Sequence, residues 1–265
     1  DRGRVGHVEV REHEPGEDRR EEPPVPDVMP VVVVLIGEIG DRRVEVVAVL
    51  GAADARLAVR VRDGSVLWKT YLVDRPVKTG KMPNGTETFG PSGAGVWSAP
   101  TVDAARGVLY VATGDNYSRP ATTTSDAIVA LSLTDGHIVW SQQATQGDVF
   151  NSSCSRVAKC PFRNGPDVDF GSSAMLVRAN NGRDILIAGQ KSGVVHAFDP
   201  DDKGRILWQT RIARGGANGG VQWGMASDGT HVYAAAAGSV RMRPILMTAV
   251  ATIFALMPLV SGLSE

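Results

Sequence analysis

The sequence predicts an all-β protein built from repeated four-stranded antiparallel units of the β-propeller type. Three observations predict this class. Glycine is abundant, with 30 of 265 residues, which is typical of turn-rich β architectures. A motif that reads as turn, strand and tryptophan occurs three times, and short apolar runs precede two of its copies. Internal repeats of this kind indicate stacked units that bury a shared core.

Composition and charge narrow the functional classes. Hydrophobic residues make up 43% of the chain, enough for a sizeable core. The formal net charge of −1 provides no basic field of the kind that nucleic-acid binding needs. Two cysteines are too few for a four-thiolate metal site or a dense disulfide framework. We therefore expect a globular protein that does not bind nucleic acid.

The N-terminal part divides into two segments. Residues 1–30 hold 14 charged residues and five prolines, so we expect disorder there. No secretory signal pattern is visible in this segment. Within residues 31–62, the runs Val31–Ile36 and Val44–Leu50 predict two β-strands around a glycine-containing turn. We see no ligand motif in that short β segment.

Residues 63–238 contain the repeats. The three motif copies are Asp63–Trp68, Asp135–Trp140 and Lys203–Trp208. Apolar runs upstream of the last two predict further strands that fold back on them as antiparallel meanders. These runs are Gly107–Ala112, Ile128–Leu131, Asp184–Gly189 and Val194–Phe198.

The tryptophan spacing shows that each unit carries a long loop. The three tryptophans stand 72 and 68 residues apart, more than the roughly 40–50 residues of a plain propeller blade. Asn116–Ser125 and Asp148–Asp169 are the long loops in which we expect the chemistry. A periodic aromatic can lock one blade against the next, and ordinary core packing is the simpler alternative.

The C-terminal part, residues 239–265, differs in character. Pro244–Leu263 is a run of twenty uncharged residues that follows Arg241 and Arg243. Its length and flanks predict a transmembrane helix, and a buried helix kinked at Pro258 is the alternative.

The middle of the chain resembles the quinoprotein alcohol dehydrogenases, eight-bladed propellers that bind pyrroloquinoline quinone (PQQ), and within them the polyvinyl-alcohol dehydrogenase branch. The segments that carry the resemblance are Gly95–Pro100, Tyr110–Ser118, Trp140–Asp148, Asn164–Gly171, Gly189–Gly193 and Gly219–Gly224. The resemblance implies oxidation of secondary or polymeric alcohols with PQQ and Ca²⁺ in the periplasm. It also implies a separate electron acceptor such as a cytochrome c, because the sequence has no Cys-x-x-Cys-His haem motif.

The resemblance also suggests binding residues. Trp97 matches the tryptophan that forms the floor of the cofactor site, since a planar quinone stacks well on an aromatic face. Lys191 matches the basic residue near the quinone oxygens, and Trp223 is a further cofactor-binding candidate. Asp115 matches a calcium-ligand position, with Asn116 beside it as a second oxygen donor. The alternative for Lys191 is an exposed lysine in a turn, and the alternative for Asp115 and Asn116 is an ordinary turn without a ligand.

The catalytic base is harder to place. Asp148 falls in the loop after Trp140, and the family's catalytic aspartate stands three residues further along. That position holds Asn151, which cannot act as a carboxylate base. Asp148 is therefore the nearest replacement, and Asp167 and Asp169 compete with it.

Cys154 and Cys160 look like a loop disulfide, which fits a periplasmic protein, and two unlinked thiols are the alternative.

Three recognisable blades are fewer than the family's eight, so we expect a partial propeller derived from such an enzyme. A non-catalytic propeller scaffold that serves envelope assembly is the alternative. The segment after Gly238 resembles a transmembrane segment of resistance-nodulation-division efflux transporters. This abrupt change leads to the hypothesis that the chain joins unrelated coding fragments, and a transporter fragment is the third functional reading.

Overall fold

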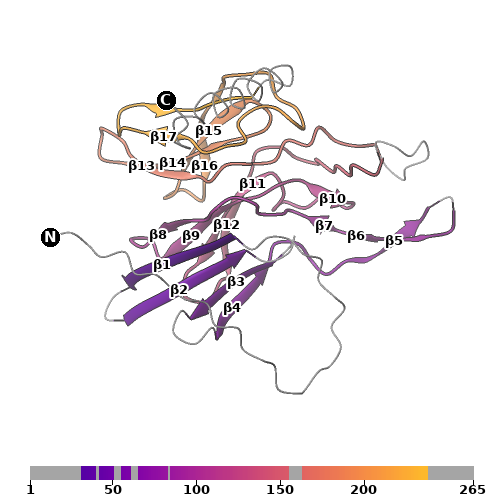
Figure 1. Ribbon diagram of the computed structural model, residues 1–265, viewed down its shortest axis with the longest axis horizontal. Coiled ribbons are helices and arrows are strands. Elements are labelled where there is room, and N and C mark those ends of the chain that lie inside the picture. Colours follow the sequence, from indigo (N-terminus) through magenta and orange to yellow (C-terminus); the bar gives the residue numbers. More distant parts are fainter. Residues whose placement is uncertain are drawn as a thin grey trace, which may run out of the picture.

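The computed structural model describes residues 31–39, 42–50, 55–60, 65–82, 84–154 and 163–237 of this chain. Three four-stranded antiparallel sheets lie one above the next in chain order (Figure 1). Within each sheet, neighbouring strands follow one another along the chain, apart from β10, which comes between β9 and β11 in sequence but pairs elsewhere. The predicted all-β class and the four-stranded antiparallel units are confirmed.

The first sheet has the order β1-β2-β3-β4. Its strands are β1 (Val31–Ile39), β2 (Arg42–Leu50), β3 (Ala55–Arg60) and β4 (Val66–Tyr71). The hairpin predicted from the two apolar runs is confirmed, with both strands longer than expected. Because β3 pairs with β4, the segment at 31–62 shares a sheet with the first tryptophan motif.

The second and third sheets have the orders β12-β11-β9-β8 and β13-β14-β15-β16. Their strands are β8 (Thr101–Asp103), β9 (Val108–Ala112), β11 (Ala127–Ser132), β12 (Ile138–Gln143), β13 (Met175–Arg178), β14 (Asp184–Gly189), β15 (Val194–Asp199) and β16 (Arg205–Arg211). Three small ladders pair β5 (Val77–Lys81) with β6 (Glu87–Gly90), β7 (Ser92–Gly93) with β10 (Asn116–Ser118), and β17 (Ala226–Ser227) with β18 (Val232–Tyr233).

The core lies between the sheets, and the middle sheet is covered on both faces. Successive side chains of a strand point to opposite faces. Leu109 and Val111 of β9 accordingly join the cluster with Trp68, whereas Val108 and Tyr110 join the cluster with Phe198. Burial on both faces explains why β9 and β11 read as continuous apolar runs rather than as alternating ones.

Each motif tryptophan occupies the same place in its sheet. Trp68, Trp140 and Trp208 pair with an alanine of the preceding strand, and the register shifts directly after each pair. Trp68 Nε1 donates to the Leu133 carbonyl oxygen at 3.1 Å. The ring also lies where a side chain at Gly136 would be. Trp68 thus packs on the motif turn of the second sheet.

The same contact recurs one unit later. A side chain at Gly204 would overlap the ring of Trp140, so Trp140 packs on the motif turn of the third sheet. The exposed fraction of each tryptophan agrees with these contacts. Trp68 and Trp140, which pack on a motif turn, are 7% and 9% exposed, whereas Trp208 is 41% exposed. The interpretation that the periodic tryptophan locks one unit against the next is therefore supported at both internal junctions.

Arg106, between β8 and β9, ties the second sheet to the third. Its guanidinium lies 2.8 Å from Asp103 Oδ2 and 2.9 Å from Asp184 Oδ2. Nε lies 2.8 Å from Asp201 Oδ1, in the turn that leads into β16. One cation thus links two sheets through three carboxylates.

The expectations for residues 1–30 and for the apolar segment within 239–265 fall outside the described residues. Within the ranges that the structure describes, there is no helix long and apolar enough to cross a membrane.

Candidate functional site

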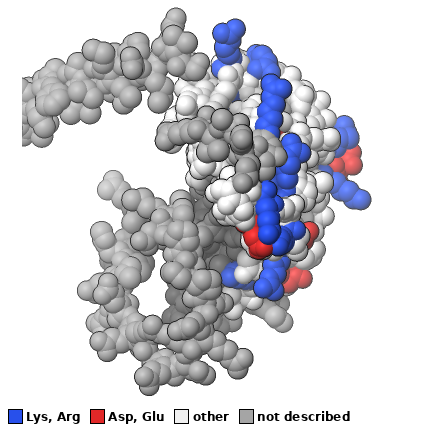
Figure 2. All heavy atoms as spheres, turned by 90° about the vertical axis from the view of Figure 1, so that its right-hand side faces the viewer, with Lys and Arg blue, Asp and Glu red and all other residues white. Residues whose placement is uncertain are grey.

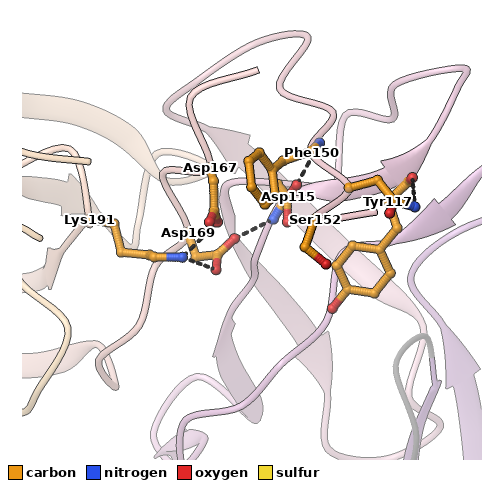
Figure 3. A pocket seen from close by; sticks show the side chains of 8 residues that line it. Asp115, Tyr117, Phe150, Ser152, Asp167, Asp169 and Lys191 are labelled. Atoms are coloured by element: carbon orange, nitrogen blue, oxygen red, sulfur yellow. Dashed lines mark hydrogen bonds and ion pairs between the residues drawn. The ribbon is translucent and has the colours of Figure 1, made fainter. Parts of the chain in front are cut away.

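Connecting segments from neighbouring sheets bring three aspartates and one lysine together (Figure 3). Asp115 follows β9, and Lys191 lies in the turn between β14 and β15. Asp167 and Asp169 lie in the long segment before β13. One carboxylate oxygen from each aspartate lies within 4.8 Å of the other two.

Lys191 is the cation of this cluster. Its Nζ donates to Asp167 Oδ1 at 2.6 Å and to Asp169 Oδ2 at 2.9 Å, and its side chain is buried. Burial alone lowers the pKa of Lys191, but its hydrogen bonds to the two carboxylates and their negative charge outweigh burial and raise it. Lys191 therefore stays charged.

Backbone amides fix the carboxylates. Asp169 Oδ1 accepts a hydrogen bond from the Asp115 N–H at 2.7 Å, and Asp115 Oδ2 accepts one from the Phe150 N–H at 2.8 Å. A side chain at Gly114 would overlap Asp169 Oδ1. Glycine at this position therefore lets the carboxylate reach the backbone.

The cluster carries more negative charge than Lys191 can balance. Burial, together with the charges of Asp169 and Asp167, raises the pKa of Asp115 to about 8. Burial also raises the pKa of Asp167, although its hydrogen bond from Lys191 acts in the opposite direction. Carboxylate oxygens are hard ligands that suit Ca²⁺. The cluster can accordingly hold either a proton or a cation.

A cavity of about 450 Å³ opens onto these four side chains. Tyr117, Phe150, Asn151 and Ser152 also line it. In Figure 3, Lys191 and Tyr117 lie at opposite ends of the view with the carboxylates between them. Charged groups and a partly exposed aromatic ring thus face one space.

Several of the residues predicted from the sequence meet here. Asp115 and Lys191 belong to the cluster, and Asn151 lines the cavity, where its Nδ2 donates to the Tyr117 carbonyl oxygen at 3.3 Å. Asp148 is buried, is not part of the cavity lining, and accepts a hydrogen bond from the Val168 N–H at 3.0 Å.

The Asn116 amide is used elsewhere. Its Nδ2 donates to the Ser92 carbonyl oxygen at 3.2 Å, and its Oδ1 accepts from the Thr122 N–H at 2.7 Å. The structure therefore does not bring this side chain into the acidic cluster.

The two tryptophan candidates differ. The ring of Trp97 lies where a side chain at Gly171 would be, two residues after Asp169. Trp223 is 68% exposed and does not line the cavity. Cys154 is disulfide-bonded, and Cys160 lies outside the described residues.

Tyr117, Phe150 and Ser152 were not singled out from the sequence, and Asp167 and Asp169 were only competitors there. A usable signal for Asp167 and Asp169 is that they stand two residues apart, directly before the apolar residue Phe170. Alternate carboxylates beside a buried aromatic indicate a segment held against the core.

Exposed charge is distributed differently from this buried cluster. Figure 2 shows Lys and Arg side chains in a row down one face, with few Asp and Glu side chains beside them. Asp115 and Asp169, in contrast, are buried. The face in Figure 2 therefore carries mainly basic side chains, whereas the candidate site is acidic.

Residues 2–156 match the PQQ family, described as the glucose/ethanol/alcohol dehydrogenase β-propeller domain. The chain belongs to this family. The three four-stranded sheets are therefore blades of a PQQ-type propeller, and the predicted propeller class is confirmed.

Two curated relatives of this PQQ-family chain are polyvinylalcohol dehydrogenases. The one from Pseudomonas sp is 40% identical over 182 residues, which are 68% of this chain and 28% of the relative. The one from Sphingopyxis sp. (strain 113P3) is 35% identical over 187 residues, again 68% of this chain and 28% of the relative. The chain thus spans 28% of the length of these relatives.

A solved structure also matches the PQQ-family chain. The quinohemoprotein alcohol dehydrogenase ADHIIG from Pseudomonas putida HK5 covers 64% of this chain and is itself covered to 26%, with 17% identity and a TM-score of 0.43.

Proposed function

We propose that this chain is part of a PQQ- and Ca²⁺-dependent alcohol dehydrogenase that oxidises secondary hydroxyl groups of polymeric alcohols such as polyvinyl alcohol. The observation that carries the proposal is the buried Lys191 ammonium group between Asp167 and Asp169, beside Asp115, at the wall of a cavity. Electrons would pass to a separate acceptor such as a cytochrome c in the periplasm.

The residues present fit both groups. The carboxylates of Asp115 and Asp169, whose oxygens lie within 4.8 Å of each other, offer the hard donors that Ca²⁺ takes, which leaves Asp167 for proton transfer. When bound, PQQ supplies the electron-accepting carbonyl, and Ca²⁺ polarises it. Lys191 would attract the anionic quinone, and Trp97 presents a flat ring next to the segment that carries Asp169.

We infer that Asp167 takes the hydroxyl proton. Its Oδ1 accepts from Lys191, and its Oδ2 has no hydrogen-bond partner in the described part of the chain. Burial raises the pKa of Asp167 toward the range in which a general base works well. Asp169 is less suited, because both of its oxygens accept hydrogen bonds.

The sequence candidates then take other roles. Asp148 does not face the cavity, so it is a poor base. Asn151 lines the cavity and can hold the substrate hydroxyl by a hydrogen bond from its amide.

The experiment is a titration of the purified full chain with PQQ in millimolar Ca²⁺, followed by tryptophan fluorescence and dye-linked oxidation of a secondary alcohol. Asp167→Asn is expected to keep saturable PQQ binding, because Lys191 and the carboxylates of Asp115 and Asp169 remain, but to oxidise the alcohol about 100-fold more slowly or worse. Asp202→Asn, an exposed aspartate at the β15–β16 turn, is the control and should change neither.

Oxidation by Asp167→Asn at the rate of the unmodified chain would rule out Asp167 as the base. A folded chain that neither binds PQQ nor oxidises alcohol would contradict the proposed function and favour a non-catalytic scaffold.

A further inference from the structure

Asp148 is buried just outside the cavity and contacts the backbone of the segment that bears two cluster carboxylates. Its Oδ2 accepts from the Val168 N–H at 3.0 Å and its Oδ1 from the Asp167 N–H at 3.4 Å. A side chain at Gly165 would overlap Asp148 Oδ1. The glycine therefore opens the space through which the carboxylate reaches these amides.

The backbone at Asp167 needs such support. Its φ is +55°, in the left-handed region that residues with a Cβ rarely adopt. Strained residues persist where the surroundings hold them in place, and they often occur at functional sites. The side chain of Asp167 reaches Lys191 from this strained position.

The contacts form a closed cycle among three segments. Asp169 accepts from the Asp115 N–H, and Asp115 accepts from the Phe150 N–H. Asp148, two residues before Phe150, accepts from the residues just before Asp169. Each segment therefore contributes one carboxylate and at least one amide, and Asp148 provides the one carboxylate of the cycle that does not line the cavity.

We propose that Asp148 is a positioning residue that holds the left-handed backbone at Asp167 and thereby aims the carboxylates of Asp167 and Asp169 at their shared site. The expected effect on cation and cofactor binding rests on the proposed function. The hydrogen bonds by which Asp148 holds this backbone do not depend on catalysis. Asp148 acts through Asp167 and Val168 and touches no substrate.

The first test measures the affinity of the full chain for terbium(III) alone, by its tryptophan-sensitised luminescence. Asp148→Ala is expected to weaken binding about tenfold or more, as loss of a group that orients metal ligands typically does. Asp148→Asn keeps one acceptor oxygen and should fall between. Asp199→Asn, another buried aspartate that accepts a backbone N–H, is the matched control and should stay within about twofold.

A double-mutant cycle separates positioning from general destabilisation. Glycine adopts a φ of +55° without strain, so in an Asp167→Gly background Asp148→Ala should weaken terbium binding by no more than about twofold. An equal loss in both backgrounds, or a loss no larger than that of Asp199→Asn, would overturn the proposal.

A second measurement is independent of any ligand. Amide hydrogen exchange at Asp167 and Val168 should speed up about tenfold or more in Asp148→Ala and remain unchanged in Asp199→Asn. Unchanged exchange in Asp148→Ala would overturn the positioning role even if terbium binds. Failure of the unmodified chain to bind terbium would instead count against the cation site of the proposed function, and the exchange result would still decide the role of Asp148.

Discussion

Asp126 is the residue whose environment differs most from that of an ordinary aspartate. It is fully buried with φ +48°, and neither carboxyl oxygen has a hydrogen-bond partner in the part of the chain that the structure describes. Burial, followed by the nearby charge of Asp148, raises the pKa of Asp126 to about 9. The folded protein therefore binds a proton here at neutral pH.

Replacing Asp126 by asparagine should make stability less dependent on pH. An acid whose pKa is raised on folding contributes stability below its ordinary pKa and loses that contribution as pH rises toward 9. Asp126→Asn keeps the shape, tolerates positive φ and carries no charge. We expect its advantage in free energy of unfolding over the unmodified chain to grow by about 1 kcal/mol for each pH unit between pH 5 and pH 9, as measured by urea unfolding.

Asp202→Asn serves as the control for this comparison, because its carboxylate is exposed. Parallel pH profiles for Asp126→Asn and the unmodified chain would contradict the protonated state of Asp126.

Only some of the residues of the candidate site could be predicted from the sequence. Asp115 and Lys191 could be predicted because the segments around them resemble those of the quinoprotein alcohol dehydrogenases. Asp167 could not be ranked above Asp148, because the choice depends on how the loop after β12 folds back. Contacts between residues 54 positions apart, such as Asp115 with Asp169, decide which carboxylate faces the cavity. Such contacts between distant residues cannot be inferred from the order of residues along the chain.

Among the elements, the motif turns matter as much as the strands. Gly136 has φ +75°, and its missing side chain leaves the space that Trp68 occupies. Two requirements thus meet at one glycine, a left-handed backbone and a close aromatic contact.

Gly136→Ala should destabilise the protein by about 3 kcal/mol or more, since backbone strain and steric overlap add. Gly182→Ala is the matched control, because Gly182 has a similar φ of +78° with no atom near the added Cβ. It should cost only about 1 kcal/mol, the strain contribution. Thermal unfolding measures both, and equal losses would show that the contact with Trp68 adds nothing.

Most strands of the four-stranded sheets could be predicted from apolar runs and motif turns, whereas β3, β8, β13 and the three small ladders could not. Ser92–Gly93 and Asn116–Ser118 carry almost no apolar signal. They pair because β9 and the segment after β6 are held by the core, which is a tertiary effect.

Across the whole molecule, neighbouring blades are joined by packing and by one charged link. The core between the second and third sheets includes Tyr110, Phe170 and Phe198, and Arg106 closes its edge. The carboxylate of Asp103 in this link is buried, so it depends on the guanidinium.

Arg106→Met should therefore cost about 2–4 kcal/mol, because a buried carboxylate loses its partner. It should also speed amide exchange in β13 and β14. Arg205→Met removes a cation that sits 58% exposed beside Asp202 and should cost under about 1 kcal/mol. Comparable losses in urea unfolding would indicate that the link between the sheets is only a surface feature.

The tryptophan contacts also have a consequence for synthesis on the ribosome. Trp68 reaches its partner glycine 68 residues later in the sequence. At about 5–20 residues per second, a nascent chain would wait roughly 3–14 s before that ring is covered. The tryptophan ring of a completed blade would therefore stay exposed to chaperones until the next blade is synthesised. Folding would then proceed from the N-terminus, one blade behind synthesis.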